Sequence, residues 1–289
     1  MLAYLLVYPL LWLISKLPFA ALIKLSDAVA WLLESVIRYR HDVVYENLKN
    51  AFPDKRDEER AAIAHKFYRH LSDRLFETIK MQSITKAELL NRVSFPEYEK
   101  ATSLVDRGQS IVAVMGHCGS WEMACLAASA FLPEYSLYSV FTPVANRYFN
   151  QYFIQLRSRF GMRLYSMKEM VQHLRRGFGE ASIGMYVADQ GHSNPDRAYW
   201  RQFLHQETNF MTGPARFALA HQSALVFVDI RQTGRMRYAV VPEVLTTTPQ
   251  LCSETALTDM FVNRLEQQIR QNPADWLWSH KRWKHKKKK

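Results

Sequence analysis

The sequence predicts an α/β fold, in which a mainly parallel central sheet is flanked by helices. The first observation is a series of short apolar runs rich in Val and Ile, at residues 111–115, 137–141, 182–188 and 224–230. Runs of this kind are typical of strands that are buried on both faces. The second observation is that segments of helical character alternate with them, at residues 146–160, 167–178 and 213–222. Such alternation favours parallel strands joined by crossover helices.

Further elements are expected on either side of this region. A last strand at residues 236–242 and a long helix at residues 255–271 follow it. Before it, residues 38–82 are helical in character, and Asp54 is placed to cap a long segment. Apolar residues recur every four positions in that segment, which predicts one buried face. They are Ile63, Phe67, Leu71, Leu75 and Ile79.

The amino terminus is strongly apolar. Residues 2–14 carry no charge, and a second apolar stretch covers residues 19–37 after Lys16 and Pro18. The first stretch is shorter than the roughly twenty residues that a helix needs to span a bilayer, and no small-residue cleavage site follows a basic leader, as it would in a signal peptide. We expect residues 1–37 to form a retained membrane-anchoring helical segment, either a shallow or re-entrant helix or a tilted span. A buried helical hairpin is the alternative.

The remaining residues, 38–289, are expected to form one domain with a basic tail from about residue 284. The chain has 38 Lys and Arg against 27 acidic residues, a net charge of +11. A basic surface favours an acidic partner, which could be anionic membrane lipid, nucleic acid or an acidic carrier protein. No zinc-finger, RNA-recognition or helix-turn-helix pattern is visible, which argues against nucleic acid.

The three cysteines predict neither a disulfide framework nor a zinc site. Cys118, Cys125 and Cys252 form no C-x-x-C pair and cannot all be paired with one another. We interpret Cys118 as a small filler residue.

The segment at residues 111–124 is the most informative. An apolar strand ends there and a helix opens near Ser120, so His117 lies at the carboxyl end of a strand, where open α/β sheets bind their ligands. Residues five apart on one continuous helix point about 140° apart. His117 and Glu122 therefore need a turn at Gly119 in order to meet, and glycine has that conformational freedom.

A His and a carboxylate side by side suit acid–base chemistry. A neutral imidazole can take the proton from an attacking hydroxyl group, while a carboxylate fixes its tautomer and stabilises the imidazolium that forms. Ser120 is a candidate nucleophile, but it lacks the G-x-S-x-G elbow, and we expect it to be a helix cap. Direct transfer from a thioester donor needs no enzyme nucleophile.

Residues 116–122, Gly-His-Cys-Gly-Ser-Trp-Glu, resemble the active-site motif of the lipid A biosynthesis acyltransferases, the late lauroyl and myristoyl transferases of Gram-negative bacteria. The resemblance covers nearly the whole chain. Residues 38–53 are similar to the family's amino-terminal signature, residues 66–71 to the helix that follows it, and residues 276–283 to its carboxyl-terminal box. Several motifs in the right order are more specific than any one of them. The Lys-rich tail departs from the family pattern.

The resemblance implies a glycerolipid-acyltransferase-like fold. It also implies an enzyme on the cytoplasmic face of the inner membrane that moves an acyl chain from acyl carrier protein to a hydroxyl of a lipid A precursor, without a metal or cofactor. His117 would be the general base and Glu122 its partner. The family's other functional positions fall on Arg157 and Asp189. Arg159, on the same helix, could replace Arg157 in binding substrate phosphate or stabilising the oxyanion.

Several alternatives stay open at this stage. Arg157 could belong to a solvated helix face. Asp189 closes a buried strand before Gly191, again at the ligand-binding edge, and could orient an arginine or the imidazole, with a helix cap or a turn residue as the alternative. Trp276, Trp278 and Trp283 suit a membrane interface, with ordinary core packing as the alternative for the first two. An acyltransferase for another glycolipid, an aminolipid or a lysophospholipid is the alternative function, and a non-catalytic membrane scaffold is a further one. Acyl chain length, the acceptor hydroxyl and the oligomeric state are not predicted.

Overall fold

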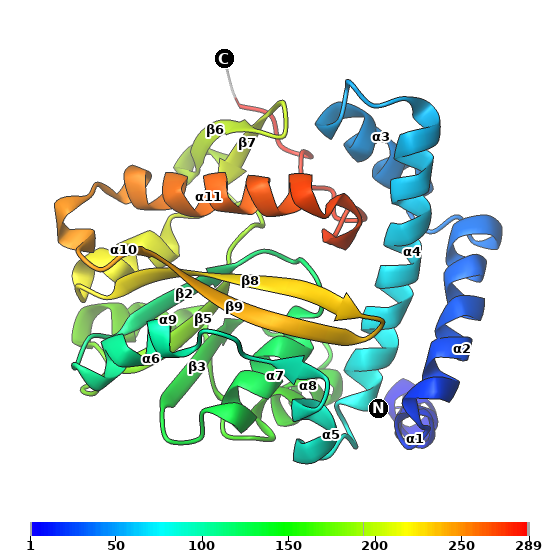
Figure 1. Cartoon of the computed structure of the whole chain (residues 1–289), viewed down its shortest axis with the longest axis horizontal. Coiled ribbons are helices and arrows are strands. Elements are labelled where there is room, and N and C mark those ends of the chain that lie inside the picture. The colour runs from blue at the N-terminus through cyan, green and yellow to red at the C-terminus, as the bar shows by residue number, and fades with distance from the viewer. Residues whose placement is uncertain (1, 193, 288–289) are drawn as a thin grey trace.

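A computed structural model of the protein describes residues 2–192 and 194–287, with side chains from residue 7 onward. Within these residues a seven-stranded sheet has the strand order β1-β9-β8-β2-β5-β3-β4. Helices cover both of its faces, with α11 on one side and α6 and α7 on the other (Figure 1). The predicted α/β class with a mainly parallel sheet is confirmed.

All five predicted strands are present, each within a few residues of its expected bounds except at the longer ends of β8 and β9. Strands β2, β3, β4, β5 and β8 run parallel, whereas β9 is antiparallel to β8 and β1 is parallel to β9. The strands are β1 (Val93–Ser94), β2 (Ile111–Met115), β3 (Ser136–Phe141), β4 (Arg163–Ser166), β5 (Ser182–Val187), β8 (Ala224–Gly234) and β9 (Arg237–Thr246). Strands β1 and β4 were not predicted, because runs of two to four residues carry too little pattern.

A separate antiparallel hairpin of β6 (Tyr199–Phe203) and β7 (Gln206–Phe210) was also missed. Its two-residue turn places Leu204 and His205 at positive φ, 50° and 63°. Such a turn normally uses Asn or Gly. The sequence therefore lacks the usual hairpin signal.

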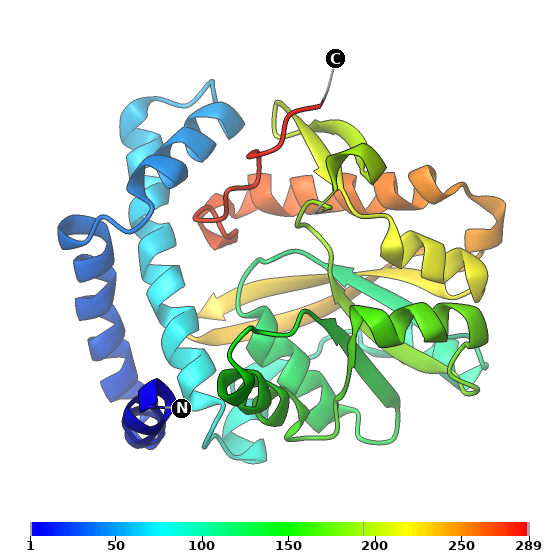
Figure 2. The same cartoon turned by 180° about the vertical axis from the view of Figure 1, so that it is seen from behind.

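Strand β2 shows why its sequence is a continuous apolar run. Alternate residues Ile111, Ala113 and Met115 lie in a core shared with α7 (Trp121–Phe131). Val112 and Val114 lie in a second core, which is shared with α10 (Gly213–Ala220) and α11 (Glu254–Gln271). Because helices cover both faces, neither set of side chains can be polar. Figure 2 shows the same layers from behind.

The other helices complete the two layers and the amino-terminal part. The crossover helices α8 and α9 and the carboxyl-terminal α10 and α11 begin and end within a few residues of the predicted bounds. The remaining elements are α1 (Leu2–Ser15), α2 (Phe19–Trp31), the π-helical turn η1 (Leu32–Val36), α3 (His41–Ala51), α4 (Asp57–Lys80), α5 (Lys86–Leu90), α6 (Glu99–Asp106), α8 (Arg147–Ser158), α9 (Met167–Arg176) and the 3-10 turns η2 (Pro195–Arg197), η3 (Pro249–Leu251) and η4 (Pro273–Asp275).

Two details of the long helix α4 differ from expectation. The helix begins at Asp57 rather than beside Asp54, and the Glu59 carboxylate accepts a hydrogen bond from the Arg56 main-chain N–H at 3.0 Å. Leu75 of the predicted buried face is 49% exposed. A row with four-residue spacing rotates by about 40° at each step, because one turn has 3.6 residues. Ile79, at the end of the row, is nevertheless buried, because α2 packs against that part of α4.

The amino-terminal helices α1 and α2 lie against α4 (Figure 1). Phe19 and Leu22 of α2 are buried in the same core as Phe76 and Ile79 of α4. Among the described residues, no helix combines the length and the hydrophobicity that crossing a membrane would require. The division of the chain at residue 37 stays a prediction.

Candidate active site

Two adjacent strands bring the main candidate residues together. Strands β2 and β5 are parallel neighbours, with Met115 paired to Val187 at their carboxyl ends. His117 follows β2 by two residues and Asp189 follows β5 by two residues. Both side chains therefore lie at the edge of the sheet where open α/β folds bind ligands, as predicted for His117.

His117 and Asp189 form a hydrogen-bonded pair. His117 Nδ1 lies 2.5 Å from Asp189 Oδ1, and the His117 main-chain N–H donates to Asp189 Oδ2 at 3.0 Å. A carboxylate beside Nδ1 favours the tautomer that carries its proton there. The lone pair is then on Nε2, which lies 3.3 Å from the Gln190 amide nitrogen. His117 keeps 16% of its side chain exposed, so Nε2 is placed to act as a base.

The environment keeps Asp189 ionised. The residue is only 3% exposed, and burial by itself raises the pKa of a carboxyl group. The neighbouring His117 and the hydrogen bonds from His117 and Trp276 outweigh burial, so the pKa of Asp189 lies below its usual range. Asp189 is therefore a buried carboxylate that can stabilise an imidazolium.

The loop between β2 and α7 is held in one conformation. Gly119 has φ of +56°, and a Cβ atom there would lie 2.9 Å from Ile230 Cγ2. The Gly119 N–H donates to the Asp275 carbonyl at 3.2 Å. The Trp121 ring packs edge-on against the His117 ring, with centroids 4.8 Å apart. These contacts confirm the predicted turn at Gly119 and fix the imidazole.

Glu122 is not beside the imidazole. Its carboxylate accepts two hydrogen bonds from Arg157, from Nε at 2.8 Å and from Nη2 at 2.5 Å. Because α7 begins at Trp121, Glu122 lies in its first turn and is paired with helix α8. From the sequence, Glu122 is expected beside the imidazole. In the structure, Asp189 lies beside Nδ1 instead. Arg157 is thus in a bidentate ion pair and not on a solvated helix face.

Arg159 has a different environment from Arg157. Its guanidinium donates to the main-chain carbonyl of Met81 and, at 3.0 Å, to that of Ile84. These contacts join α8 to the segment after α4. The structure does not bring Arg159 into the pair with Glu122, so the two arginines are not interchangeable.

Neither Ser120 nor Cys118 has the surroundings of a nucleophile. Ser120 is the N-cap residue of α7, as predicted, but its side chain makes no capping hydrogen bond. Its hydroxyl interacts instead with Glu77, whose pKa burial raises to about 7. Burial, with Asp189 and Asp275 nearby, raises the pKa of the Cys118 thiol well above its usual value. Cys118 therefore stays a neutral, buried thiol.

Two of the three carboxyl-terminal tryptophans lie inside the protein, and Trp283 is partly buried. Trp276 and Trp278 are 2% and 0% exposed, so core packing is correct for them and the membrane-interface interpretation is wrong. The Trp276 indole N–H donates to Asp189 Oδ2 at 2.7 Å. This contact was not predicted from the sequence, although Trp276 opens the carboxyl-terminal box of the resemblance.

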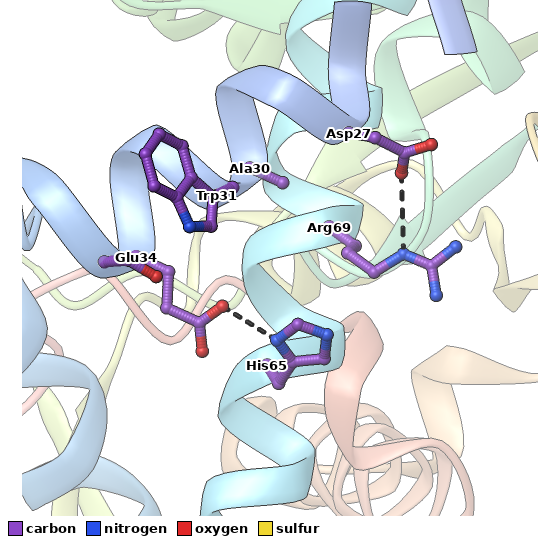
Figure 3. Close-up of a pocket in the computed structure, with 7 residues that line it drawn as sticks. Asp27, Ala30, Trp31, Glu34, His65 and Arg69 are labelled. Carbon is purple, nitrogen blue, oxygen red and sulfur yellow. Dashed lines mark hydrogen bonds and ion pairs between the residues drawn. The ribbon is translucent and has the colours of Figure 1, made fainter. Parts of the chain in front are cut away.

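One cavity lies apart from these residues. It measures about 430 Å³ and is lined by residues of α2, η1 and α4. Figure 3 shows Glu34 reaching toward His65, and Asp27 toward Arg69; the distances are 2.8 Å and 3.9 Å. Because its charged groups are paired with one another, we assign no chemistry to this cavity. No cluster of His, Cys, Asp and Glu suited to a metal ion occurs among the described residues.

The chain matches the model of a known protein family. A family model for bacterial lipid A biosynthesis acyltransferases matches residues 1–285, which is nearly the whole chain. No curated protein matches the chain.

Proposed function

Because this chain belongs to the bacterial lipid A biosynthesis acyltransferase family, we propose that it transfers a fatty acyl chain from acyl carrier protein to a hydroxyl group of a lipid A precursor. Family membership makes it an acyltransferase of lipid A biosynthesis. The single observation that supports the mechanism is the His117–Asp189 pair, in which a buried carboxylate holds Nδ1 and leaves Nε2 as a base.

In the proposed reaction, Nε2 of His117 removes the proton from the acceptor hydroxyl as its oxygen attacks the thioester carbonyl. The tetrahedral intermediate then collapses to the ester and expels the carrier thiolate, which takes the proton back from the imidazolium. Asp189 stabilises that imidazolium. Because a thioester is already activated, the reaction needs no enzyme nucleophile, metal or cofactor.

We assign Glu122 and Arg157 to substrate binding. Glu122 occupies Nε and Nη2 of the guanidinium, so Nη1 remains for a phosphate of the precursor or for the oxyanion. The bidentate geometry fixes the plane of the guanidinium. Glu122 then acts through Arg157 and not through the imidazole of His117.

Glu122→Ala is expected to lower kcat/KM by roughly 10- to 100-fold, the range for losing hydrogen bonds to a charged group. The acidic limb of the pH–rate profile should stay in place, because Glu122 is paired with Arg157 and not with the imidazole. Arg157→Ala should lower kcat/KM by a similar factor. The double variant should lower it little further, because the two residues act as one unit. Steady-state kinetics across pH measures all three.

The exposed ion pair of Arg163 and Glu180, 3.1 Å apart, supplies the control. Glu180→Ala should leave kcat/KM within about twofold, since exposed pairs contribute little. A shift of the acidic limb in Glu122→Ala would contradict the assignment of Glu122 to substrate binding. It would indicate instead that Glu122 acts on His117.

Charge supports the proposed donor. The net charge of +11 would attract an acidic carrier protein and raise its rate of association, an effect that falls with ionic strength. It would also attract anionic membrane lipid. Lys287 of the basic tail is paired with Glu207 at 3.3 Å, and residues 288–289 lie outside the described residues.

We propose that the enzyme binds the cytoplasmic face of the inner membrane through its amino-terminal helices. Large apolar side chains of α1, α2, η1 and the residue after η1 are exposed, and we call them the N-terminal apolar surface. They are Leu10, Trp12, Leu13, Trp31, Val36 and Ile37. Lys16 lies 5.0 Å from the Trp12 ring. Exposed tryptophans beside cations suit the headgroup region of a bilayer.

The variant Leu10→Ser with Leu13→Ser should bind vesicles containing anionic lipid at least about tenfold more weakly, because burying each leucine contributes roughly 2 kcal/mol. Co-sedimentation with vesicles measures the loss. Leu251→Ser is the control, because Leu251 is 81% exposed on η3, outside the N-terminal apolar surface. Equal binding by the two variants would exclude this surface as the membrane contact.

The function itself is tested by acyl transfer from labelled acyl carrier protein to a lipid A precursor in detergent micelles. The expected product is the precursor with one further ester-linked chain. A glycolipid, an aminolipid and a lysophospholipid serve as competing acceptors. If the folded protein acylates one of these and not the precursor, the proposed acceptor is wrong.

A further inference from the structure

We propose that Trp276 is a positioning residue for the His117–Asp189 pair. Its indole N–H donates to Asp189 Oδ2 at 2.7 Å, and both side chains are almost fully buried. A hydrogen bond to a buried carboxylate is stronger than one between neutral groups. The inference rests on the proposed role of His117 as the base, because Trp276 acts on the reaction only through Asp189.

The contacts of Asp189 explain what Trp276 contributes. The last torsion of an aspartate is broad and has no strong preference of its own, so the donors around the carboxylate set its plane. Oδ2 receives the Trp276 indole and the His117 main-chain N–H, at 2.7 and 3.0 Å. Oδ1 is thereby left facing His117 Nδ1. Without the indole N–H, only groups of His117 itself would orient the carboxylate.

Trp276 is itself held in place against the active-site loop. It forms a backbone bridge with Cys118, and its ring packs edge-on against Trp278, with centroids 4.7 Å apart. The preceding carbonyl, that of Asp275, accepts from Gly119 N–H and from Arg74 Nη1. The segment therefore joins the loop that carries His117 to the carboxylate that orients it.

Asp189 also acts on two other titratable groups. Burial lowers the pKa of His280, while Asp189 raises it and Arg282 lowers it. Burial likewise lowers the pKa of Arg282, to about 10, against the attraction of Asp189. Arg282 therefore remains charged at neutral pH, and neither group replaces the Trp276 hydrogen bond. Both stay unchanged in the variants below.

Trp276→Phe removes the N–H and keeps an aromatic ring. We expect kcat to fall roughly 10- to 100-fold, as for the loss of one hydrogen bond to a charged group. With one donor fewer, the carboxylate keeps more of its negative charge for the imidazolium. The acidic limb of the pH–rate profile should therefore move to higher pH. Acyl transfer measured across pH gives both quantities.

Trp278→Phe is the matched control. Trp278 is equally buried, and its indole donates to the Pro273 carbonyl at 2.5 Å and not to the pair. It should lower the melting temperature about as much as Trp276→Phe while the acidic limb stays in place. Identical kinetics for the two variants would overturn the proposal.

If Trp276→Phe does not fold, incorporation of benzothienylalanine at this position replaces the N–H by sulfur without changing the ring size. The same fall in kcat and the same shift are expected, and a parent-like profile would refute the positioning role. Failure of the proposed function looks different. In that case His117→Ala stays active, whereas failure of this inference leaves His117→Ala inactive and Trp276→Phe like Trp278→Phe.

Discussion

His117→Ala should lower kcat by about a hundredfold to ten-thousandfold, the range that general base catalysis contributes. The imidazole is the group beside a buried carboxylate at the carboxyl ends of β2 and β5, and alanine leaves the acceptor hydroxyl without a base. KM should change little, because the imidazole is proposed to act on the proton and not on the remainder of the substrate. The measurement is acyl transfer under saturating donor and acceptor.

His65→Ala is the control for this variant. His65 is paired with Glu34 at the cavity shown in Figure 3, and its loss should leave kcat within about twofold, as for an exposed ion pair. If His65→Ala is inactive and His117→Ala retains activity, the reaction takes place at that cavity and the site assigned here is wrong.

The sequence was sufficient to place His117 and Asp189 at one sheet edge. Each follows a continuous apolar run, such runs are typical of buried parallel strands, and the carboxyl ends of parallel strands share an edge. Which strands are neighbours could not be predicted, because β5 follows β2 along the chain only after β3 and β4. From the sequence, Glu122 is therefore the expected partner of the imidazole, whereas in the structure that partner is Asp189.

Contacts between segments far apart in the sequence could not be predicted either. Trp276 is separated from Asp189 by 87 positions, and its burial and its hydrogen bond depend on how the segment after α11 crosses the active-site loop. An amphipathic indole surrounded by cations has the same sequence signature at a membrane surface and in a core. Burial separates these two cases, and burial is a property of the assembled fold.

Asp189→Asn should lower kcat by about ten-thousandfold, comparable to the known effect of this substitution in a Ser-His-Asp triad. Two N–H groups point at Oδ2, so the asparagine must place its only oxygen there. Its NH2 group then faces His117 Nδ1, which must accept a hydrogen bond. The proton moves to Nε2, and the imidazole can no longer act as a base. The rate of acyl transfer at saturating substrate measures the loss.

Asp229→Asn is the control that separates catalysis from stability. Asp229 is also 3% exposed and accepts hydrogen bonds from Arg231, Arg264 and Gln268, but none of these groups is proposed to take part in the reaction. Its substitution should lower the melting temperature with kcat nearly unchanged.

The pKa of Asp189 is lowered in the folded protein. Ionisation of Asp189 therefore stabilises the fold above the unfolded pKa of about 4. This contribution is lost only as pH falls through the folded value. A loss of activity near neutral pH would therefore not reflect protonation of Asp189. If Asp189→Asn keeps parent-like kcat, the carboxylate does not set the tautomer and the proposed pair is wrong.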